Sequence, residues 1–379
     1  MISGGVKCKT IYLLRFFERQ SGFKYLSRGI LDTFKSCIVV WNAYSFNTFQ
    51  LTIPLIPTYL PYFIEENILS IKDCYFYIDV IKFDSSQSNL ITITGKSLLG
   101  KAKDRIIRST YSVLNKKPEL IIYDLINNHV VTGAGSSRSF NFLSIQQPDD
   151  LQTTALNYQN SYGKVSEEIS SLADSNQICI RELATNLENP AAQIQLYKGR
   201  DLSGDGGVEF SLSDEGLKTE NIVRDNSDLS TTAYVFGEGE GTARKNVLIG
   251  DGFTGIERRE LYVDARDLQQ SSTNDNGTTV NLTDSDYKAQ LMQRGQQSLA
   301  ERVEVIQLSG EINFNNLNFQ YGKDYEVGDT VRVTSQRFGI TKSSVLTSMQ
   351  ETWDAEGGYH LDPTFDKDRV SLIKKLTRK

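Results

Sequence analysis

The sequence predicts a mainly β fold with α+β inserts, and three observations support this prediction. Near the C-terminus, residues 321–333 read as strand, tight turn and strand, because Gly328-Asp329 suits the positive backbone angles of a short turn. Near the N-terminus, residues 41–54 and 91–94 are rich in strand-forming side chains. Helical spacing occurs between these ends. From pattern alone, the C-terminal segment therefore indicates a small antiparallel barrel or sandwich.

The first hundred residues are predicted to be mostly strand. Residues 51–57 (Leu-Thr-Ile-Pro-Leu-Ile-Pro) indicate a strand that ends at a sheet edge, because each proline removes a hydrogen-bond donor. Residues 75–83 and 90–94 flank a polar loop and are typical of a hairpin. Gly95 breaks this pattern, and the first β unit is expected to end at residue 99.

The middle of the chain is expected to mix helices and strands. Helical spacing runs over residues 97–128, where Pro118 suits a first turn and Leu120, Tyr123 and Ile126 share one face. Thr283 and the acidic residues after it predict the cap of a longer helix. Its apolar face follows at four-residue spacing: Tyr287, Leu291, Gly295, Leu299 and Val303. The other predicted segments are a helix over 161–172, strands over 177–182, 192–197, 208–212 and 233–236, and a surface loop over 269–279.

The composition is that of a folded protein with several structural units. A chain of 379 residues is too long for one core. Its net charge of −6 disfavours a general nucleic-acid binder, since phosphate binding needs clustered Lys and Arg. Four cysteines without a C-x-x-C pair and two histidines offer no zinc site, and no apolar run reaches membrane-spanning length. We therefore expect no metal, no cofactor and no membrane, and assembly in a reducing cytoplasm.

Candidate chemical motifs are each incomplete. Residues 201–212 place Asp, Ser, Asp and Gly as a calcium loop does, but Leu212 stands where the loop needs its final Glu. The glycine-rich stretch 236–242 lacks the Lys-Ser/Thr ending of a phosphate loop. Neither His129 nor His360 lies near a nucleophile signature. We therefore predict no catalytic, cofactor-binding or metal-binding residues and no enzymatic activity.

Three segments, taken in order, resemble one protein family. They are the strand Phe-x-Leu-x-Ile-Pro at residues 49–54, the run Thr-Gly-Lys-Ser-Leu-Leu-Gly at 94–100 and the hairpin Tyr-x-Val-Gly-Asp-x-Val at 325–331. Over residues 30–362 the chain resembles the tail hub proteins of bacteriophages. The resemblance implies a structural protein of the virion, located at the phage tail tip or baseplate. It also implies two small β-barrel tube domains that flank inserted domains.

This resemblance implies a division of the chain into five segments. They are a first tube-forming barrel (1–99), an α-containing insert (100–182), a β-rich insert (183–283), a connecting helix (284–303) and a second tube-forming barrel with a basic tail (304–379). Three chains would form a six-barrel ring that closes the tail tube and has a channel for DNA. Such a lumen is expected to be neutral or acidic so that DNA slides, with the basic residues of 367–379 turned outward.

Barrels that join a tube must pair their edge strands across subunits, and the family places Arg-Arg-Glu strands where subunits meet. The suspected inter-subunit contacts are Leu51, Thr52, Ile53, Arg258, Arg259, Glu260, Thr330, Val331, Arg332 and Val333. The implied partners are two further copies, the distal tail protein, the tail tube protein, the C-terminus of the tape-measure protein and a tail fibre or tip protein. DNA is a partner in transit.

Two other functions stay open at this stage. A tail-associated cell-wall hydrolase needs a pair of catalytic carboxylates, and the 47 acidic residues do not mark one pair over another. A carbohydrate-binding receptor adhesin is the other alternative, because tyrosine-rich β surfaces stack on sugars. Digestion of host cell wall and glycan binding by the isolated protein, respectively, distinguish these functions from a structural hub.

Overall fold

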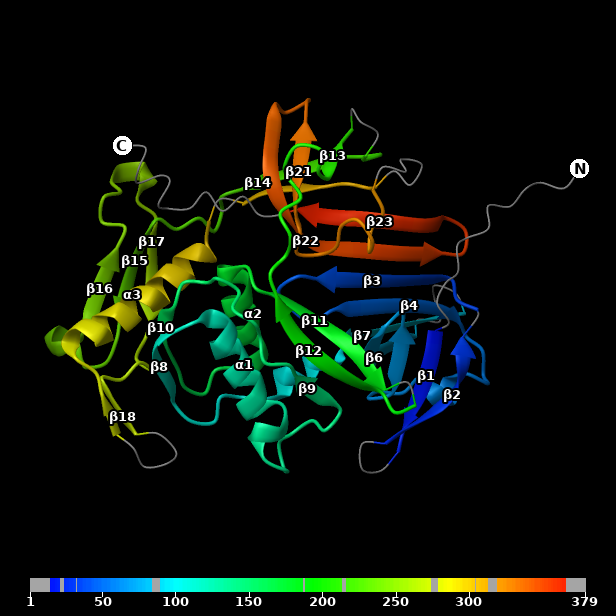
Figure 1. Cartoon of the computed structure of the whole chain (residues 1–379), viewed down its shortest axis with the longest axis horizontal. Helices are drawn as coiled ribbons and strands as arrows, with labels where there is room; N and C mark the ends of the chain where they lie inside the picture. Colours follow the sequence, from blue (N-terminus) through cyan, green and yellow to red (C-terminus); the bar gives the residue numbers. More distant parts are fainter. Residues whose placement is uncertain are drawn as a thin grey trace, which may run out of the picture.

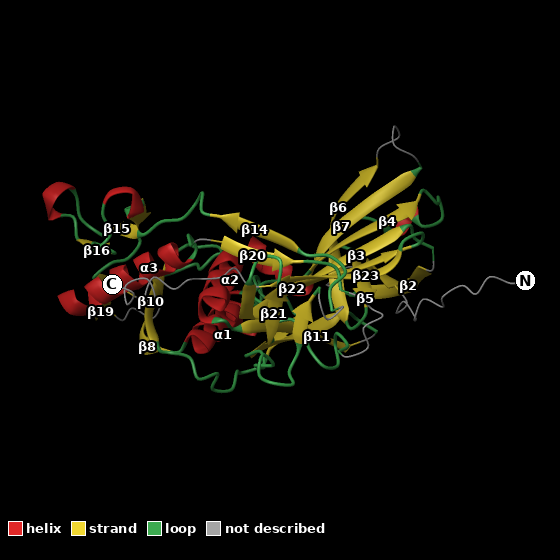
Figure 2. Ribbon diagram, turned by 90° about the horizontal axis from the view of Figure 1, so that it is seen from above, coloured by secondary structure: helices red, strands yellow, loops and turns green. Residues whose placement is uncertain are grey.

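The computed structural model describes residues 14–20, 24–31, 33–83, 89–186, 188–212, 216–273, 279–303, 305–312 and 319–365 of the chain. A large sheet occupies one side of the molecule, and a small sheet with a long helix occupies the other (Figure 1). Two further helices lie between them. Seen from above, these parts follow one another along the longest axis (Figure 2). The mainly β prediction is confirmed.

The large sheet, called the main sheet below, combines thirteen described strands from both ends of the chain. They are β1 (Leu14–Arg19), β2 (Tyr25–Leu31), β3 (Ser36–Asn42), β4 (Thr48–Pro54), β5 (Ile68–Ile71), β6 (Cys74–Phe83), β7 (Leu90–Ser97), β13 (Glu209–Ser211), β14 (Asn221–Asp225), β20 (Val305–Ser309), β21 (Thr330–Ser335), β22 (Ile340–Asp354) and β23 (Gly358–Phe365). The order is β14-β20-β23-β22-β3-β4-β7-β6-β5-β1-β2, and β21 joins β13 to β22.

The join between the two ends of the chain is the antiparallel pair β3–β22, in which Val39 lies opposite Glu351. Because of this pair, the N-terminal and C-terminal strands form one continuous sheet. The described strands form no closed barrel, so the two tube barrels stay a prediction.

The predicted edge position of residues 51–57 is wrong. Strand β4 lies inside the sheet, with β3 on one side and β7 on the other. Pro54 is the last residue of β4, where the missing N–H removes little from the ladder. The preceding residues therefore pair on both edges, and Leu51 and Ile53 are buried in the core.

A mixed α/β layer lies beside the main sheet. It contains β8 (Tyr111–Lys116), α1 (Pro118–His129), β9 (Leu143–Ile145), β10 (Leu156–Asn160), α2 (Val165–Asn176), β11 (Cys179–Asn186), β12 (Ala191–Tyr197) and the 3-10 turns η2 (Leu98–Asp104) and η3 (Thr132–Ala134). Pro118 occupies the first turn of α1, as predicted. Residues 97–128 are not helical throughout, because β8 precedes α1 and pairs with β10.

The small sheet consists of β15 (Thr232–Phe236), β16 (Asn246–Ile249) and β17 (Glu260–Asp264), and α3 (Asp284–Ala300) packs on it. The Thr283 side chain caps α3 by accepting from the Asp286 N–H, as predicted. Gly295 is required by packing, because a Cβ there would lie 2.5 Å from Val235 Cγ2. The remaining short elements are η1 (Leu60–Tyr62), η4 (Gly241–Ala243), η5 (Gly255–Glu257), β18 (Ser271–Thr273) and β19 (Thr279–Asn281).

Candidate functional site: the polar face and the free edges of the main sheet

One face of the main sheet carries hydroxyl and amide side chains on β4, β7 and β22, with Ile38 and Val40 of β3 between them. Side chains of a strand alternate between the two faces, so this face is separate from the core. The register places Gln50 opposite Ile38 on one side and Thr94 on the other. We define the polar face as Ile38 and Val40 on β3, Thr48, Gln50 and Thr52 on β4, Thr92, Thr94 and Lys96 on β7, and Ser348, Gln350 and Thr352 on β22.

The polar face is hollowed by a groove of about 400 Å³. Charges at the groove are paired: Lys96 lies 3.6 Å from Asp79, and Lys103 donates to Asp79 at 2.8 Å. Burial alone would raise the pKa of Asp79, but the hydrogen bond and charge of Lys103 outweigh it and hold that pKa below its usual value. A face of this composition binds water and offers a polyanion few cations to hold.

The path of the main sheet ends at two strands, β2 and β14, which each pair on one side among the described residues. Both edges expose apolar side chains: Leu26 (47%) and Ile30 (42%) on β2, and Val223 (44%) on β14. A bulge interrupts β2 near Arg28, whereas β14 pairs with β20 without a register shift. Exposed apolar edge strands are templates for pairing with another chain, and β14 lacks the bulge that protects such an edge.

The suspected contacts on β4 and β21 divide between core and surface. Leu51, Ile53, Val331 and Val333 are buried inside the subunit. Strand β21 already pairs with β13 on one side and β22 on the other. The half-buried members are Thr52, Thr330 and Arg332. Only these three of the seven side chains are therefore accessible to a neighbour in this subunit structure.

The suspected contacts at residues 258–260 lie at the start of β17. Arg258 Nε donates to Glu260 Oε1 at 2.7 Å, and Arg258 Nη2 donates to Tyr234 Oη at 2.7 Å. Arg259 donates to the Asn226 carbonyl at 2.6 Å. These side chains thus have partners within the subunit, and the described pairing of β17 is with β15 alone.

The turn at Gly328-Asp329 has a structural role that the sequence pattern did not reveal. Gly328 adopts φ +98°, which explains the glycine. Asp329 is fully buried, and its carboxylate accepts from the Arg200 backbone N–H at 2.8 Å and from the Arg200 guanidinium at 2.6 Å. The turn therefore fastens β21 to the segment before β13.

A second buried carboxylate lies at the join between β3 and β22. Glu351 is fully buried and contacts three donors: Trp41 Nε1 at 2.6 Å, the Lys72 ammonium and the Tyr359 hydroxyl. Lys72 also lies 5.9 Å from the Trp41 ring and 5.4 Å from the Trp353 ring. This cluster links both ends of the chain. The burial of Glu351 could have been read from the sequence, because Glu351 alternates with the apolar residues Met349 and Trp353 and so lies on the same buried face of the strand.

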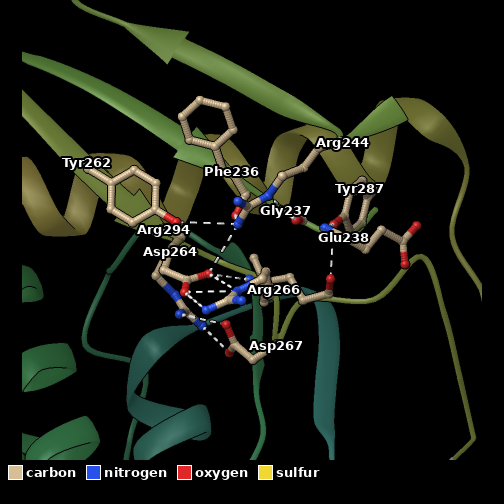
Figure 3. A network of polar contacts seen from close by, with 11 residues as sticks. Phe236, Gly237, Glu238, Arg244, Tyr262, Asp264, Arg266, Asp267, Tyr287 and Arg294 are labelled. Carbon is tan, nitrogen blue, oxygen red and sulfur yellow. Dashed lines mark hydrogen bonds and ion pairs between the residues drawn. The ribbon is translucent and has the colours of Figure 1, made fainter. Parts of the chain in front are cut away.

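Polar contacts join the loops of the small sheet to α3 (Figure 3). Arg244 lies over Phe236, 5.2 Å from the ring centroid, and donates to the Gly237 carbonyl at 3.1 Å. On α3, Arg294 donates to Asp267 at 3.0 Å and to the Gln159 carbonyl of β10 at 3.0 Å. Arg294 therefore connects α3 with the segment after β17 by an ion pair and with β10 by a hydrogen bond.

In the incomplete calcium loop, Asp201 accepts from the Ser203 backbone N–H at 3.0 Å and from its hydroxyl at 2.7 Å, which makes a local turn. The described residues contain no cluster of potential metal ligands. No helix in the described part of the chain is long and apolar enough to cross a membrane. The basic residues of 367–379 lie outside the described residues.

Two solved tail proteins have a fold similar to that of this chain. The tail protein from Neisseria meningitidis MC58 aligns with a TM-score of 0.54 and 13% identity, covering 96% of this chain and 98% of that one. The 43 kDa tail protein of prophage MuSo2 from Shewanella oneidensis aligns with a TM-score of 0.53 and 11% identity, covering 94% and 98%. The chain therefore has a fold similar to that of these two tail proteins.

The family follows from the sequence. The model of the family described as Siphovirus ReqiPepy6 Gp37-like protein matches residues 20–365, so the chain belongs to this family. The predicted recognition of a phage tail protein is confirmed. A search of curated protein sequences gives no match. The E. coli c3393 protein, described as a type VI secretion component similar to T4 tail proteins gp27 and gp5, aligns at a TM-score of 0.41 and 12% identity, covering 89% of this chain and 75% of that one.

Proposed function

We propose that this tail protein is a hub: a trimeric ring that closes the tail tube, joins it to the tail tip and leaves a channel for DNA. The observation that carries the proposal is the join of both chain ends into one sheet with a hydroxyl- and amide-rich face. In the ring, the polar face lines the channel. Its paired charges let DNA slide, because a lumen without clustered cations makes few phosphate contacts.

The free edges supply the contacts between copies. Strand β14 of one copy meets β2 of the next, and this head-to-tail contact closes after three copies. Pairing then covers Val223 and the apolar side chains of β2, which are exposed in the single subunit. Each of the two barrels expected from the resemblance is completed by strands of a neighbour. The proposal thus moves the main assembly contact from β4 and β21 to β14 and β2.

The residues suspected from sequence take secondary places in this scheme. Thr52 belongs to the polar face and faces the channel. Arg332 and the pair Arg258 and Glu260 contact neighbouring copies by exchanging their ion pairs. The five-segment division of the chain is kept, with residues 284–303 as the connection between the inserts and the C-terminal β unit.

The proposed partners follow from the position of a hub in the tail. The tube protein and the distal tail protein bind one rim of the ring, and a fibre or tip protein binds the other. The C-terminus of the tape-measure protein occupies the lumen before DNA ejection. The protein assembles in the host cytoplasm and has no catalytic role of its own.

Replacing Val223 with Asp is expected to abolish trimer formation while leaving the subunit folded. A carboxylate on the pairing edge would be desolvated without a partner on assembly, and charged side chains on edges block strand addition. Sedimentation velocity measures the species present. Phe338→Asp is the matched control, since Phe338 is 55% exposed and lies outside the two edges. The edge assignment fails if both variants sediment as the wild type does.

Adding cations to the polar face is expected to make the ring hold DNA. Gln50→Lys places three new ammonium groups in the lumen of a trimer, and each phosphate contact makes the slope of log K against log salt more negative by about 0.9. Fluorescence anisotropy with a duplex fragment measures this slope for wild type and variant. Gln296→Lys, an exposed position on α3, is the control. Tight, steeply salt-dependent DNA binding by the wild type would contradict a sliding channel.

A further inference from the structure

The small sheet and α3 form a unit with a hydrophobic core of its own. We call residues 226–273 and 279–303 the small-sheet unit. Among the described residues, its core shares no member with the cores of the main sheet and the α/β layer. The core members are Ala233, Val235, Val263, Ala265, Leu268, Leu282, Tyr287, Leu291 and Leu299. The unit therefore buries its apolar side chains without help from the rest of the subunit.

The small-sheet unit is attached through two adjacent strands. The chain enters it from β14 and leaves it into β20, and these strands pair with Asp225 opposite Val305. At the base of the unit, the Ser230 N–H donates to the Arg302 carbonyl at 2.9 Å. In the described part of the chain, β20 pairs with β23 only at Ser309, so most of the β14–β20 ribbon has no other strand beside it (Figure 2). A unit held at the end of one ribbon can turn with changes in few backbone angles.

The contact between the small-sheet unit and the α/β layer is polar. Gln290, Arg294 and Glu301 follow one stripe of α3 and its cap, beside the apolar face that packs on the small sheet. Arg294 donates to the Gln159 carbonyl of β10 at 3.0 Å, and the Ser171 hydroxyl of α2 donates to Glu301 at 2.8 Å. Polar interfaces between parts of one chain permit relative motion, whereas large apolar ones resist it.

Two amide side chains are buried at this contact. Gln159 is 3% exposed and Gln290 is 2% exposed. Neither amide has a hydrogen-bond partner for its oxygen or its nitrogen among the described residues. Besides its paired strand β8, β10 packs on α3, and Gln290 lies one turn before Arg294, so both amides belong to the contact. Desolvated amides without partners cost free energy, and this cost disappears when water reaches them.

We propose that the small-sheet unit is hinged and swings away from the α/β layer about the β14–β20 ribbon. The arrangement in this structure is the closed one, held by the hydrogen bonds of Arg294 and Glu301 across the contact. Opening replaces these bonds with bonds to water and hydrates Gln159 and Gln290, while both parts keep their hydrophobic cores. The ion pair of Arg294 with Asp267 lies within the unit and moves with it (Figure 3). The motion belongs to the single subunit and does not depend on ring formation.

Thiol labelling of buried cysteines in the full-length protein measures this opening. Gln159→Cys and Gln290→Cys are made separately in a chain that carries Cys8→Ser, and mass spectrometry identifies the positions modified by iodoacetamide. One opening exposes both sides of the contact, so the thiols at positions 159 and 290 should react at similar rates. Each rate should be at least about tenfold higher than that of buried thiols outside the contact, which need larger unfolding. The internal controls are the buried native thiols of Cys37, Cys74 and Cys179.

A second substitution tests the cost of the buried amides. In the Gln159→Cys chain, Gln290→Leu removes a desolvated amide from the closed arrangement and should slow labelling at position 159 by about fivefold or more. Gln296→Leu, the same change at an exposed position of α3, should leave that rate unchanged. Three results would each overturn the proposal: labelling no faster than that of the native buried thiols, fast labelling at only one of the two positions, or an unchanged rate in the Gln290→Leu chain.

Discussion

Replacing Lys72 with Met is expected to lower the free energy of unfolding by about 3 kcal/mol. The substitution leaves the fully buried Glu351 carboxylate with neutral donors and no cation. Breaking a buried ion pair from one side is more costly than never having formed it, because the remaining charge stays desolvated. The lost ion pair lies at the β3–β22 pair, which joins the N-terminal and C-terminal strands, so both ends of the chain should unfold together.

Urea denaturation followed by tryptophan fluorescence measures this effect, since both tryptophans lie near Lys72. Lys103→Met is the matched control: its ion pair with Asp79 is about one-third exposed on both sides and should contribute less than about 1 kcal/mol. The double variant Lys72→Met/Glu351→Gln should recover part of the loss. Equal, small effects of the two single lysine substitutions would show that the buried cluster does not hold the join.

Replacing Glu182 with Gln is expected to stabilise the protein at pH 8 and not at pH 4. Burial raises the pKa of Glu182 to about 7, even though Ser97 and the N–H groups of Leu98 and Leu99 donate to its carboxylate. The ordinary value is 4.5, so the folded state binds a proton that the unfolded state releases. The favourable contribution is complete below pH 4.5 and disappears as the pH rises through about 7.

The size follows from the shift: each pKa unit corresponds to about 1.4 kcal/mol, which gives an effect on the order of 3 kcal/mol above pH 7. Unfolding free energies measured from pH 4 to pH 8 should fall more steeply for the wild type than for Glu182→Gln. Glu167→Gln, whose side chain is 68% exposed, should follow the wild-type profile. Parallel profiles for wild type and Glu182→Gln would mean that the pKa of Glu182 is the same in the folded and unfolded states.

The features that the sequence predicted correctly depend on nearby residues. Pro118 begins α1, Thr283 caps α3, and Gly328 forms the turn before β21, because each signal acts within a few residues. The buried spacing from Tyr287 to Leu299 was also readable, since a helix face repeats every three or four residues.

The features that the sequence did not predict depend on partners far along the chain. The prolines near β4 suggested an edge, but strands β3 and β7 decide its position. Glu351 and Trp41 are 310 residues apart and meet because β22 pairs with β3. The resemblance to phage tail proteins did not depend on these positions, since it was inferred from the order of several motifs. Which edges stay free could be identified only once the full strand order was known.

The most direct test of the hub proposal is oxidative cross-linking between the free edges. Leu26→Cys on β2 and Val223→Cys on β14 are combined in one chain with Cys8→Ser, because the described native cysteines are buried. Non-reducing gels should show covalent dimers and trimers and nothing larger, since a three-fold ring closes on itself. The single-cysteine chains should stay monomeric. Absence of cross-links, or a ladder that extends beyond trimers, would contradict a closed ring of three copies joined through β2 and β14.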